Sequence, residues 1–279
     1  MKFGFIGAGK VGFSLGKYLA DNEMEVVGYY SEFKEDALEA SKFTKSSVYK
    51  NIEDLVRDSD VLFLTVPDGA IEKVWNQVKK TGISGKVVCH CSGALSSKVF
   101  SDISELGGFG YSIHPLFAVS DRYNSYKELS NIYFTIEGSP EKIGEIRQIF
   151  EKMGNKICII SAKDKVKYHA AAAIASNLVV GLIDLSEKLL MECGFERDEA
   201  GDALAPIVWG NIKHILNNGV VEALTGPIER GDADTIKKHL ATISGNDRET
   251  YIAVSRQVLE VAKRKNKDRD YSKIEEILK

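Results

Sequence analysis

Two histidines stand at positions where an imidazole can move a proton. His114 ends a predicted strand and precedes Pro115, and His169 lies in the first turns of a long predicted helix. An unperturbed imidazole titrates near pH ~6.5, which suits general acid–base catalysis. At about 100° per residue His169 shares a helix face with Ser176, while Asn177 is offset by about 80°. We interpret His169 as the general acid or base, Asn177 as the group that orients the substrate, and His114 as the alternative proton donor. The structural alternatives are a turn histidine at 114 and a satisfied buried His–Asn pair.

A third candidate is Arg230, which lies in a segment that joins two predicted helices. The segment, residues 223–232, contains Gly-Pro and Arg-Gly-Asp elements. A guanidinium can bind a substrate carboxylate through two parallel hydrogen bonds. The alternative is that Arg230 pairs with Glu229 or Asp232 at a helix cap. A metal site is not expected, because strand alternation sends His90 away from the flanking Cys89 and Cys91, and no C-x-x-C pair exists elsewhere.

The cofactor signal is a glycine-rich hexamer near the N-terminus, Gly7-Ala8-Gly9-Lys10-Val11-Gly12. It matches G-x-G-x-x-G and sits between the first predicted strand and the first predicted helix, which is where the dinucleotide-binding fingerprint belongs. The first glycine permits the tight turn, the second lets the backbone approach a pyrophosphate, and the third lets the helix pack closely on the strand. The alternative is a strand-to-helix turn without a ligand. We predict that this loop binds a dinucleotide.

The second strand ends without the acid that is typical of NAD sites. It ends at Tyr30 and Ser31, and Lys34 follows nearby. A hydroxyl and an ammonium suit a 2′-phosphate, so we predict NADP. Glu32 can accept from a ribose 2′-OH, which keeps NAD as the alternative.

Further cofactor contacts are expected where other strands end, because ligands of such sheets lie along the carboxyl ends of the strands. Thr65, Val66 and Pro67 follow one apolar run, and Ser92 follows the next. We expect these residues to lie along the nicotinamide ribose. Plain turn chemistry is the alternative.

The elements that must position these residues change in type along the chain. Apolar β-branched runs alternate with helical patterns up to about residue 160, which predicts βαβ units and a parallel sheet covered on both faces. We expect strands at residues 2–7, 25–30, 60–66, 86–91, 108–114, 132–137 and 156–160. One intervening helix is expected to begin at Pro140 with Ser139 as its N-cap.

The strand signals stop after about residue 161. Helices are expected at residues 165–193, 197–217, 233–243 and 247–263. The fold class predicted is α/β, a Rossmann-type doubly wound parallel sheet, followed by an all-α domain. We expect a dinucleotide-binding domain at residues 1–160 and a helical substrate and dimerisation domain at residues 161–279.

Composition limits the partners. The chain has 37 basic and 40 acidic residues, a net charge of −3, so nucleic acid and anionic membrane surfaces are not expected. No unbroken apolar run approaches the ~18 residues of a membrane helix, and no signal peptide is recognised. Four cysteines do not make a disulfide scaffold, and a cytoplasmic protein is expected.

Taken together, the motifs resemble a known family. The residues that carry the likeness are the hexamer at 7–12, Val66-Pro67-Asp68, His90-Cys91-Ser92-Gly93-Ala94, His114-Pro115-Leu116, Tyr168-His169-Ala170-Ala171-Ala172, Ser176-Asn177, and residues 223–232. They are similar to those of Rossmann proteins with a C-terminal helical domain of unknown function. That family is described as candidate NADP oxidoreductases similar to pyrroline-5-carboxylate reductase and the deazaflavin-dependent NADP reductases.

The resemblance implies a Rossmann domain, a helical dimerisation domain and a substrate cleft between them. Two departures are visible. Glu32 stands where a basic residue is expected, which weakens the NADP prediction. Related β-hydroxyacid dehydrogenases carry a catalytic lysine four residues before the helix asparagine, and here that position is Ala173.

The function predicted is an NAD(P)-dependent oxidoreductase that transfers a hydride between the nicotinamide and a small carbonyl or imine, with the chain as a homodimer. The missing lysine motivates an alternative, a dinucleotide-binding sensor without turnover. A third reading, an enzyme resembling prephenate dehydrogenase, rests on His114-Pro115-Leu116-Phe117 alone.

Overall fold

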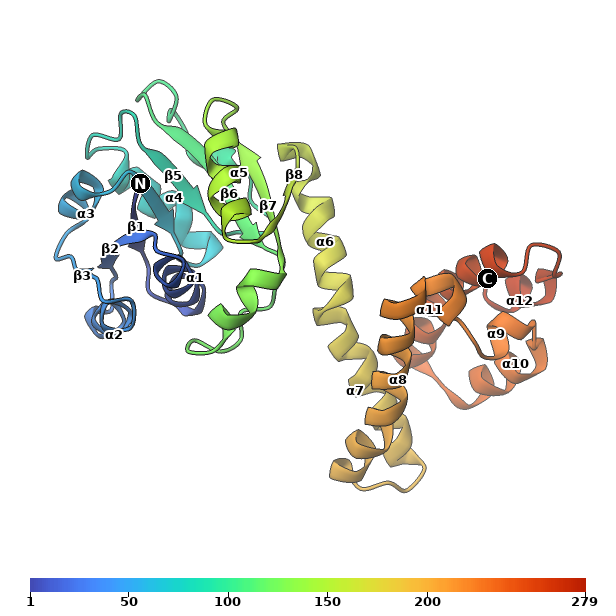
Figure 1. Ribbon diagram of the computed structural model, residues 1–279. Helices are drawn as coiled ribbons and strands as arrows, with labels where there is room; N and C mark the ends of the chain where they lie inside the picture. The colour runs from blue at the N-terminus through green and yellow to red at the C-terminus, as the bar shows by residue number, and fades with distance from the viewer. The chain divides into compact units, whose positions relative to one another are not determined.

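The computed structural model describes residues 1–279 and contains one eight-stranded sheet with the order β3-β2-β1-β4-β5-β6-β7-β8 (Figure 1). The first six strands are parallel to their neighbours, β7 is antiparallel to β6, and β8 is parallel to β7. The strand order reverses at β1, which pairs with both β2 and β4. The predicted α/β fold is confirmed, with an antiparallel step that the sequence did not indicate.

The strands follow the predicted runs closely. They are β1 (Lys2–Ile6), β2 (Glu25–Tyr30), β3 (Ser47–Val48), β4 (Val61–Leu64), β5 (Val87–His90), β6 (Phe109–Pro115), β7 (Tyr133–Gly138) and β8 (Lys156–Ile159). Only β3 was not expected, because two residues are too few to show a period in the sequence.

Helices cover both faces of the sheet. They are α1 (Lys10–Asp21), α2 (Lys34–Thr44), α3 (Ile52–Asp58), α4 (Asp68–Val78) and α5 (Ile143–Lys152), with short 3₁₀ helices at η1 (Ser97–Val99), η2 (Ser125–Asn131) and η3 (Ala162–Asp164). The predicted start of α5 was wrong. Its N-cap is Lys142, since the Ser139 hydroxyl instead accepts from the Gly110 amide at 3.0 Å.

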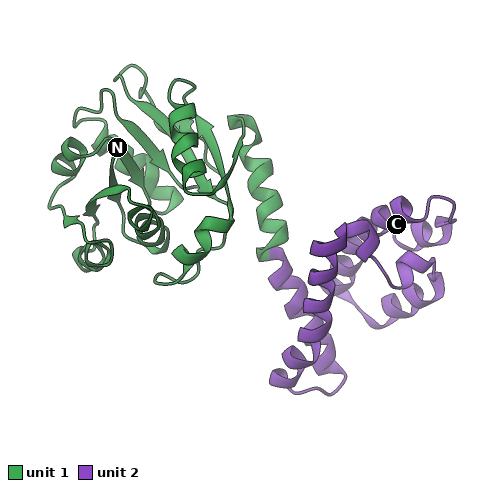
Figure 2. Ribbon diagram, viewed as in Figure 1, with its two compact units in different colours: residues 1–177 green, residues 178–279 purple.

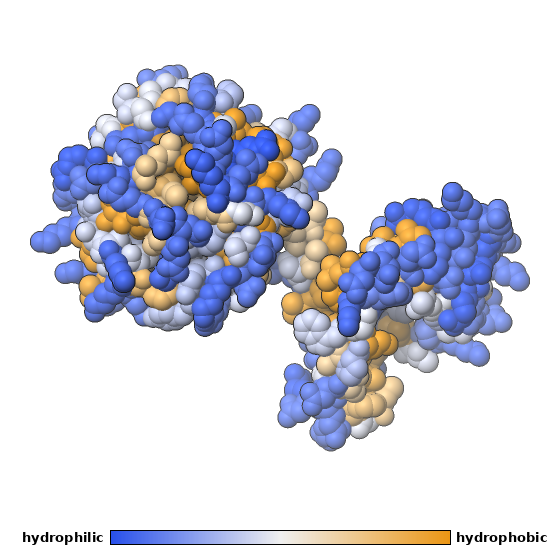
Figure 3. All heavy atoms as spheres, viewed as in Figure 1, coloured by the Kyte–Doolittle hydropathy of each residue, from blue (hydrophilic) through white to orange (hydrophobic).

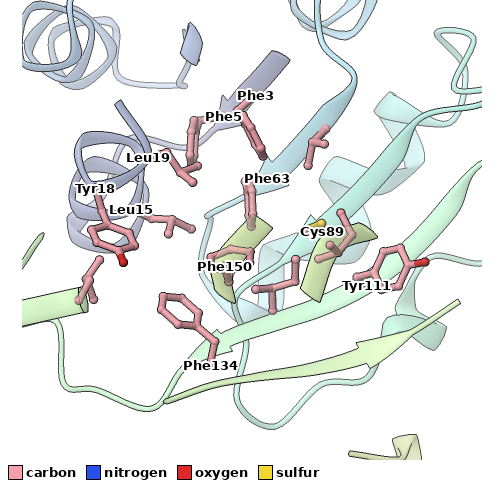
Figure 4. Packing of buried hydrophobic residues seen from close by; sticks show 14 of the residues in the cluster. Phe3, Phe5, Leu15, Tyr18, Leu19, Phe63, Cys89, Tyr111, Phe134 and Phe150 are labelled. Atoms are coloured by element: carbon pink, nitrogen blue, oxygen red, sulfur yellow. The ribbon is translucent and has the colours of Figure 1, made fainter. Parts of the chain in front are cut away.

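Alternate side chains of the central strands divide the core into two layers. On β4, Phe63 packs with Phe5 and with helix residues such as Leu19, whereas Leu62 and Leu64 face the layer around Trp75. Figure 4 shows Phe3, Phe5, Phe63, Phe134 and Phe150 in the first layer. Burial on both faces explains why β4 is an unbroken apolar run, and it holds the strand ends rigidly in register.

The chain divides into two compact units, unit 1 at residues 1–177 and unit 2 at residues 178–279 (Figure 2). The division falls later than the expected boundary at residue 160, because helix α6 (Lys165–Ala175) is anchored to the sheet by the buried Lys165. The single helix expected at 165–193 is two helices. Ser176 has non-helical angles (φ −128°, ψ −82°) and separates α6 from α7 (Asn177–Glu192).

The remaining helices are α8 (Arg197–Ala223), α9 (Pro227–Arg230), α10 (Ala233–Thr242), α11 (Gly245–Lys265) and α12 (Ser272–Ile277). Helix α8 contains a kink at Gly219, which has φ +82°. The last four elements build a small core of their own around Ile228, Ile236, Leu259 and Ile274.

Two helices of unit 2 are almost uncovered. Helix α7 has no buried residue, and only Ala200 and Ala223 are buried among the 27 residues of α8. Figure 3 shows apolar side chains at the surface of this unit. The helical run Ala162–Glu192 is long and apolar enough to cross a membrane by length and composition, and none of its most apolar stretch is buried. No run of this length was expected from the sequence, because Ser176 and Asn177 interrupt the apolar residues.

Candidate functional site

The glycine-rich loop joins β1 to α1 in the way that the fingerprint requires. Gly7 has φ +100°, a left-handed conformation that favours glycine, and a side chain there would meet the Thr65 carbonyl at 2.7 Å. A Cβ on Gly12 would lie 2.4 Å from Thr65 Oγ1. In contrast, a Cβ on Gly9 would meet no atom within 4 Å. The backbone at Gly9 is therefore accessible to a ligand, whereas neighbouring protein atoms leave no space for a side chain at Gly7 or Gly12.

The start of α1 suits an anionic group. Gly9 is its N-cap and no side chain caps the helix, so the first amides keep their hydrogen-bonding capacity. The first turn carries no acid. Uncapped amides together with the positive end of the helix dipole favour a phosphate here.

A cavity of about 440 Å³ extends from this loop across the ends of β2 and β4. It is lined by Ile6, Gly7, Ala8, Gly9, Tyr30, Ser31, Glu32, Phe33, Asp36, Ile52, Thr65, Val66, Pro67, Ala70, Lys73, Val74 and Gln77. It lies where the strand order reverses, the usual ligand position in a doubly wound sheet. The volume, the loop and the uncapped helix fit a dinucleotide. Lys10, Val11 and Gly12, also predicted as cofactor contacts, are not among the lining residues.

The end of the cavity beside β2 carries carboxylates, and the one lysine of the lining comes from α4. Ser31 and Glu32 line it, and Glu32 makes no ion pair. Lys34 is exposed and does not line it, whereas Lys73 of α4 does.

Asp36 also lines this end, and its carboxylate accepts from Arg122 Nη2 at 2.7 Å. The same guanidinium nitrogen donates to the Ala8 carbonyl at 2.8 Å, and Nη1 pairs with Glu39 at 2.9 Å. Arg122 thus holds the loop after β6 against the glycine-rich loop. Sequence reasoning did not single out this contact.

A second cavity, of about 500 Å³, lies at the end of β6 against α6. Its lining residues are His114, Leu116, Phe117, Ala118, Tyr168, His169, Ala171, Ala172, Ala173, Ala175, Ser176 and Asn177. None of these side chains is an acid, a lysine or an arginine. Three of the residues predicted for catalysis, His114, His169 and Asn177, thus line one cavity.

The two imidazoles converge on Gly93, which follows β5. A Cβ on Gly93 would lie 2.7 Å from His169 Nδ1 and 3.0 Å from His114 Nε2. Gly93 is therefore the residue type that leaves room between the two rings. His114 Nδ1 lies 2.7 Å from the Tyr168 hydroxyl, and His169 is exposed with no hydrogen bond to the protein.

The environment of His114 keeps its ring neutral. Burial lowers the pKa of His114 to about 4, and the positive charge of Lys165 adds to this effect. Burial also raises the pKa of the Tyr168 hydroxyl. Neither group carries a charge at neutral pH.

Lys165 is the site residue that sequence reasoning missed. It is 1% exposed, and its Nζ donates to the Ser92 carbonyl at 2.8 Å and to Ser112 Oγ at 2.7 Å. Burial lowers its pKa to about 8, while Glu137, Cys91 and Asp68 oppose that shift. Its signal in the sequence is the spacing Lys165-x-x-Tyr168-His169, which places three polar groups on one face of α6. The related dehydrogenases have a lysine four residues before the helix asparagine, where this chain has Ala173. Lys165 instead stands four residues before His169.

Ser92 is engaged within the protein. Its hydroxyl donates to Asp68 Oδ2 at 2.6 Å and accepts from the amides of Ala94 and Leu95. These bonds are the turn chemistry that stood as the alternative to a ribose contact. The neighbouring His90 is fully buried, with Nδ1 accepting from the Ser92 amide and Nε2 near the Ser96 carbonyl.

The remaining predicted residues stay apart from these contacts. Ser176 Oγ donates to the Ala172 carbonyl at 2.7 Å and to Asn177 Oδ1 at 3.2 Å, and no His169–Asn177 hydrogen bond forms. Arg230 lies in unit 2, where it makes no ion pair, because Glu229 is engaged by Arg269 and Asp232 caps α10. Its role as a carboxylate clamp stays a prediction. The structure contains no cluster of three or more His, Cys, Asp or Glu side chains that could hold a metal ion.

Sequence comparison divides the chain in the same order. Residues 1–115 match the Rossmann-like domain, and residues 132–258 match a domain of unknown function, DUF2520. No protein of curated function matches the sequence.

Solved structures extend the likeness over most of the chain. Protein TM1727 from Thermotoga maritima is 26% identical, with a TM-score of 0.76 over 95% of this chain and 99% of the other. The candidate NADP oxidoreductase BF3122 from Bacteroides fragilis is 20% identical, with a TM-score of 0.70 over 93% and 98%. The NADP-bound pyrroline carboxylate reductase of Plasmodium falciparum is 16% identical, with a TM-score of 0.57 over 94% and 98%.

These matches confirm the resemblance drawn from the motifs: residues 1–115 are similar to a Rossmann-like domain and residues 132–258 to a DUF2520 domain.

Proposed function

We propose that the chain is a nicotinamide-dependent oxidoreductase that acts on a small carbonyl or imine. The observation that carries the proposal is the convergence of His114 and His169 on Gly93 at the end of β5. The dinucleotide cavity ends beside β4, and β5 and β6 are the next strands, each about 4.8 Å further along the sheet. A substrate at Gly93 would therefore lie at the nicotinamide end of a dinucleotide held by the glycine-rich loop.

The chain's own groups divide the remaining work. When bound, the nicotinamide supplies or accepts the hydride. His169 is exposed in the cavity and can give a proton to the carbonyl oxygen or imine nitrogen, or take one in the reverse direction. His114 is neutral and can hydrogen-bond to the same atom. Asn177 lines the cavity and is the proposed orienting group, with Arg230 as the proposed clamp for a substrate carboxylate.

The same geometry bears on the choice of cofactor. NADP stays the proposed cofactor because the Ser31 hydroxyl lines the cavity at the end of β2 and the Lys73 ammonium lines the same cavity from α4. Relatives named for NADP support this choice. Glu32 lines the same end without a cationic partner and favours NAD, the alternative.

The direct test measures binding before turnover. Titration of the protein with NADPH and NADH, followed by nicotinamide fluorescence, should give saturable binding. Absorbance at the reduced-nicotinamide band should then decay in the presence of members of a panel of keto acids, ketones and cyclic imines. Binding without decay on any panel member would favour the sensor, and absence of binding would refute both hypotheses.

We also propose that a second copy of the chain covers the bare helices of unit 2. Trp209, Ile212 and Leu216 are exposed and recur at helical spacing on one face of α8, before its kink at Gly219. A largely apolar cavity of about 590 Å³ on the same unit is lined by Leu182, Leu185 and Leu189 of α7, among others. An apolar ridge and an apolar groove on one unit are what a two-fold symmetric interface needs.

A lipid bilayer is a less suitable partner than a second copy of the chain for the apolar faces of α7 and α8. Helix α8 carries Asp198, Glu199 and Asp202 in its first two turns, and its remaining polar positions are not enriched in cations. Helices that lie on membranes typically place lysine and arginine opposite their apolar face. The four cysteines are free, which suits the reduced cytoplasm that we propose as the location.

A further inference from the structure

Three hydrogen bonds among Lys165, Ser112 and the Ser92 carbonyl fix the position of the Ser92–Gly93 peptide. Lys165 Nζ donates to the Ser92 carbonyl and to Ser112 Oγ, and Ser112 Oγ donates in turn to the Ser92 carbonyl at 3.1 Å. Ser112 is fully buried in β6, and Ser92 follows β5. Lys165 therefore ties together the ends of two strands at the residue on which both imidazoles converge.

The protons on the His114–Tyr168 pair can be assigned. The Tyr168 hydroxyl lies 2.7 Å from His114 Nδ1 and is also near the Thr135 hydroxyl, which can itself donate, so we assign the Tyr168 proton to the bond with His114. A neutral His114 ring then carries its own proton on Nε2, which points toward Gly93. This nitrogen is a hydrogen-bond donor to a ligand atom with a lone pair, such as a carbonyl oxygen or an imine nitrogen.

The charges around His114 favour the neutral ring. Lys165 faces it from α6, with His169 on the same helix and His90 on β5 adding to the same effect, and Asp68 at the start of α4 opposes them. Lys165 is the cation of this set at neutral pH, since its pKa, lowered to about 8, still lies above 7. Its position in the first turn of α6, three residues before Tyr168 and four before His169, puts all three groups on one helix face.

We propose that Lys165 is a positioning residue that fixes the Ser92–Gly93 peptide beside the two imidazoles and reinforces the neutral, hydrogen-bond-donating form of His114 that burial already favours, which leaves proton transfer to His169. The inference rests on the proposed function and adds a division of labour between the two histidines. Lys165 is too deeply buried to touch the substrate, so it acts through His114 and Gly93.

Imidazole titration by NMR tests the proposal without relying on turnover. In the wild-type chain the His114 ring signals should stay nearly constant from pH 7 to pH 5, where Lys165 keeps its charge and His114 stays above its pKa of about 4. In Lys165→Met the pKa of His114 should rise by on the order of one pH unit, yet remain below 6.5 because burial persists. Lys165→Arg keeps the charge and should keep the wild-type titration. Lys167→Met, a change at an exposed lysine on the same helix, is the matched control.

The outcomes separate cleanly. If Lys165→Met folds and His114 still does not titrate, the electrostatic role is wrong. If wild-type His114 titrates near 6.5, the proposal fails whatever the variants do, including a Lys165→Met that does not fold. The proposed function fails independently if the wild-type chain binds no dinucleotide. In an active enzyme, Lys165→Met should also add an acidic limb to the pH dependence of kcat, with little change in the affinity for the cofactor.

Discussion

Thr65 occupies the space that a side chain at position 12 would need. Its Oγ1 lies 2.4 Å from the site of a Cβ on Gly12, and the same hydroxyl donates to the Gly7 carbonyl at 2.7 Å. Thr65, which directly follows β4, therefore fixes the shape of the glycine-rich loop through its contacts with Gly7 and Gly12. The requirement at Gly12 comes from packing within the protein, whereas the requirement predicted at Gly9 comes from the ligand.

Alanine at these two glycines should therefore have different effects. Gly12→Ala should lower the free energy of unfolding by about 1–3 kcal/mol, since Thr65 or the Gly7 backbone must move. Gly9→Ala meets no atom within 4 Å and should leave stability within about 0.5 kcal/mol while weakening dinucleotide binding. Urea unfolding and cofactor titration of both variants make the comparison. Equal stability losses would contradict the division.

His169→Ala should abolish turnover and leave cofactor affinity nearly unchanged. The side chain is exposed, makes no hydrogen bond to the protein and does not line the dinucleotide cavity, so its loss should not disturb the fold. Steady-state kinetics and nicotinamide fluorescence measure the two properties. His214→Ala, a change at an exposed histidine of α8, is the control. Undiminished turnover would remove His169 from the mechanism.

Glu32→Ser should raise the affinity for NADPH relative to NADH by about tenfold. The carboxylate lines the ribose end of the cavity without an ion pair, so it would repel a 2′-phosphate and accept from a 2′-hydroxyl. Glu35→Ser removes the same charge outside the cavity and should not change the ratio. Parallel titrations with both cofactors decide the matter, and identical ratios in the two variants would rule out a direct contact.

Acid should destabilise the fold through His90. Burial lowers the pKa of His90 to about 4, so between pH 6.5 and pH 4 the unfolded chain binds a proton that the folded chain does not. The free energy of unfolding should therefore fall as the pH drops through this range, by at most about 3 kcal/mol from this residue. Urea unfolding at pH 7, 5.5 and 4.5 measures the slope. His90→Gln should make the slope shallower, and the remainder should include His114, whose pKa burial also lowers to about 4. An unchanged slope would show that His90 does not contribute.

A charge in the apolar ridge of α8 should separate the proposed dimer. Trp209→Glu or Leu216→Glu places a carboxylate among side chains that we propose are covered by a second copy. Sedimentation should give a dimer for the wild-type chain and a monomer for either variant. Asn211 lies about 200° around the helix from Trp209, so Asn211→Glu should remain dimeric. A monomeric wild-type chain would overturn the proposal.

Much of unit 1 could be predicted from the sequence because its signals are local. The runs that became β1, β4 and β5 are bounded by turn residues, and the glycine hexamer has a fixed relation to the strand before it. The reversed direction of β7 could not be predicted, since a strand's own residues do not encode the orientation of its partner.

The site shows the same limit. His114 and His169 were found because an imidazole is uncommon and chemically distinctive. Lys165 was missed because it stands among Lys163 and Lys167 at the start of a helix, where lysines are usually solvated. Its burial depends on Ser92 and Ser112, which lie 73 and 53 residues earlier in the chain. Only the closed sheet brings these groups together.

The division of the chain at Asn177 has an evolutionary consequence. Apart from Arg230, every side chain assigned a chemical role lies in unit 1, and the bare apolar helices lie in unit 2. Substitutions in the last hundred or so residues can thus accumulate without displacing the imidazoles or the glycine-rich loop. The groups of the candidate site in unit 1 can therefore be retained while selection changes the surface of unit 2 and the partners that it binds.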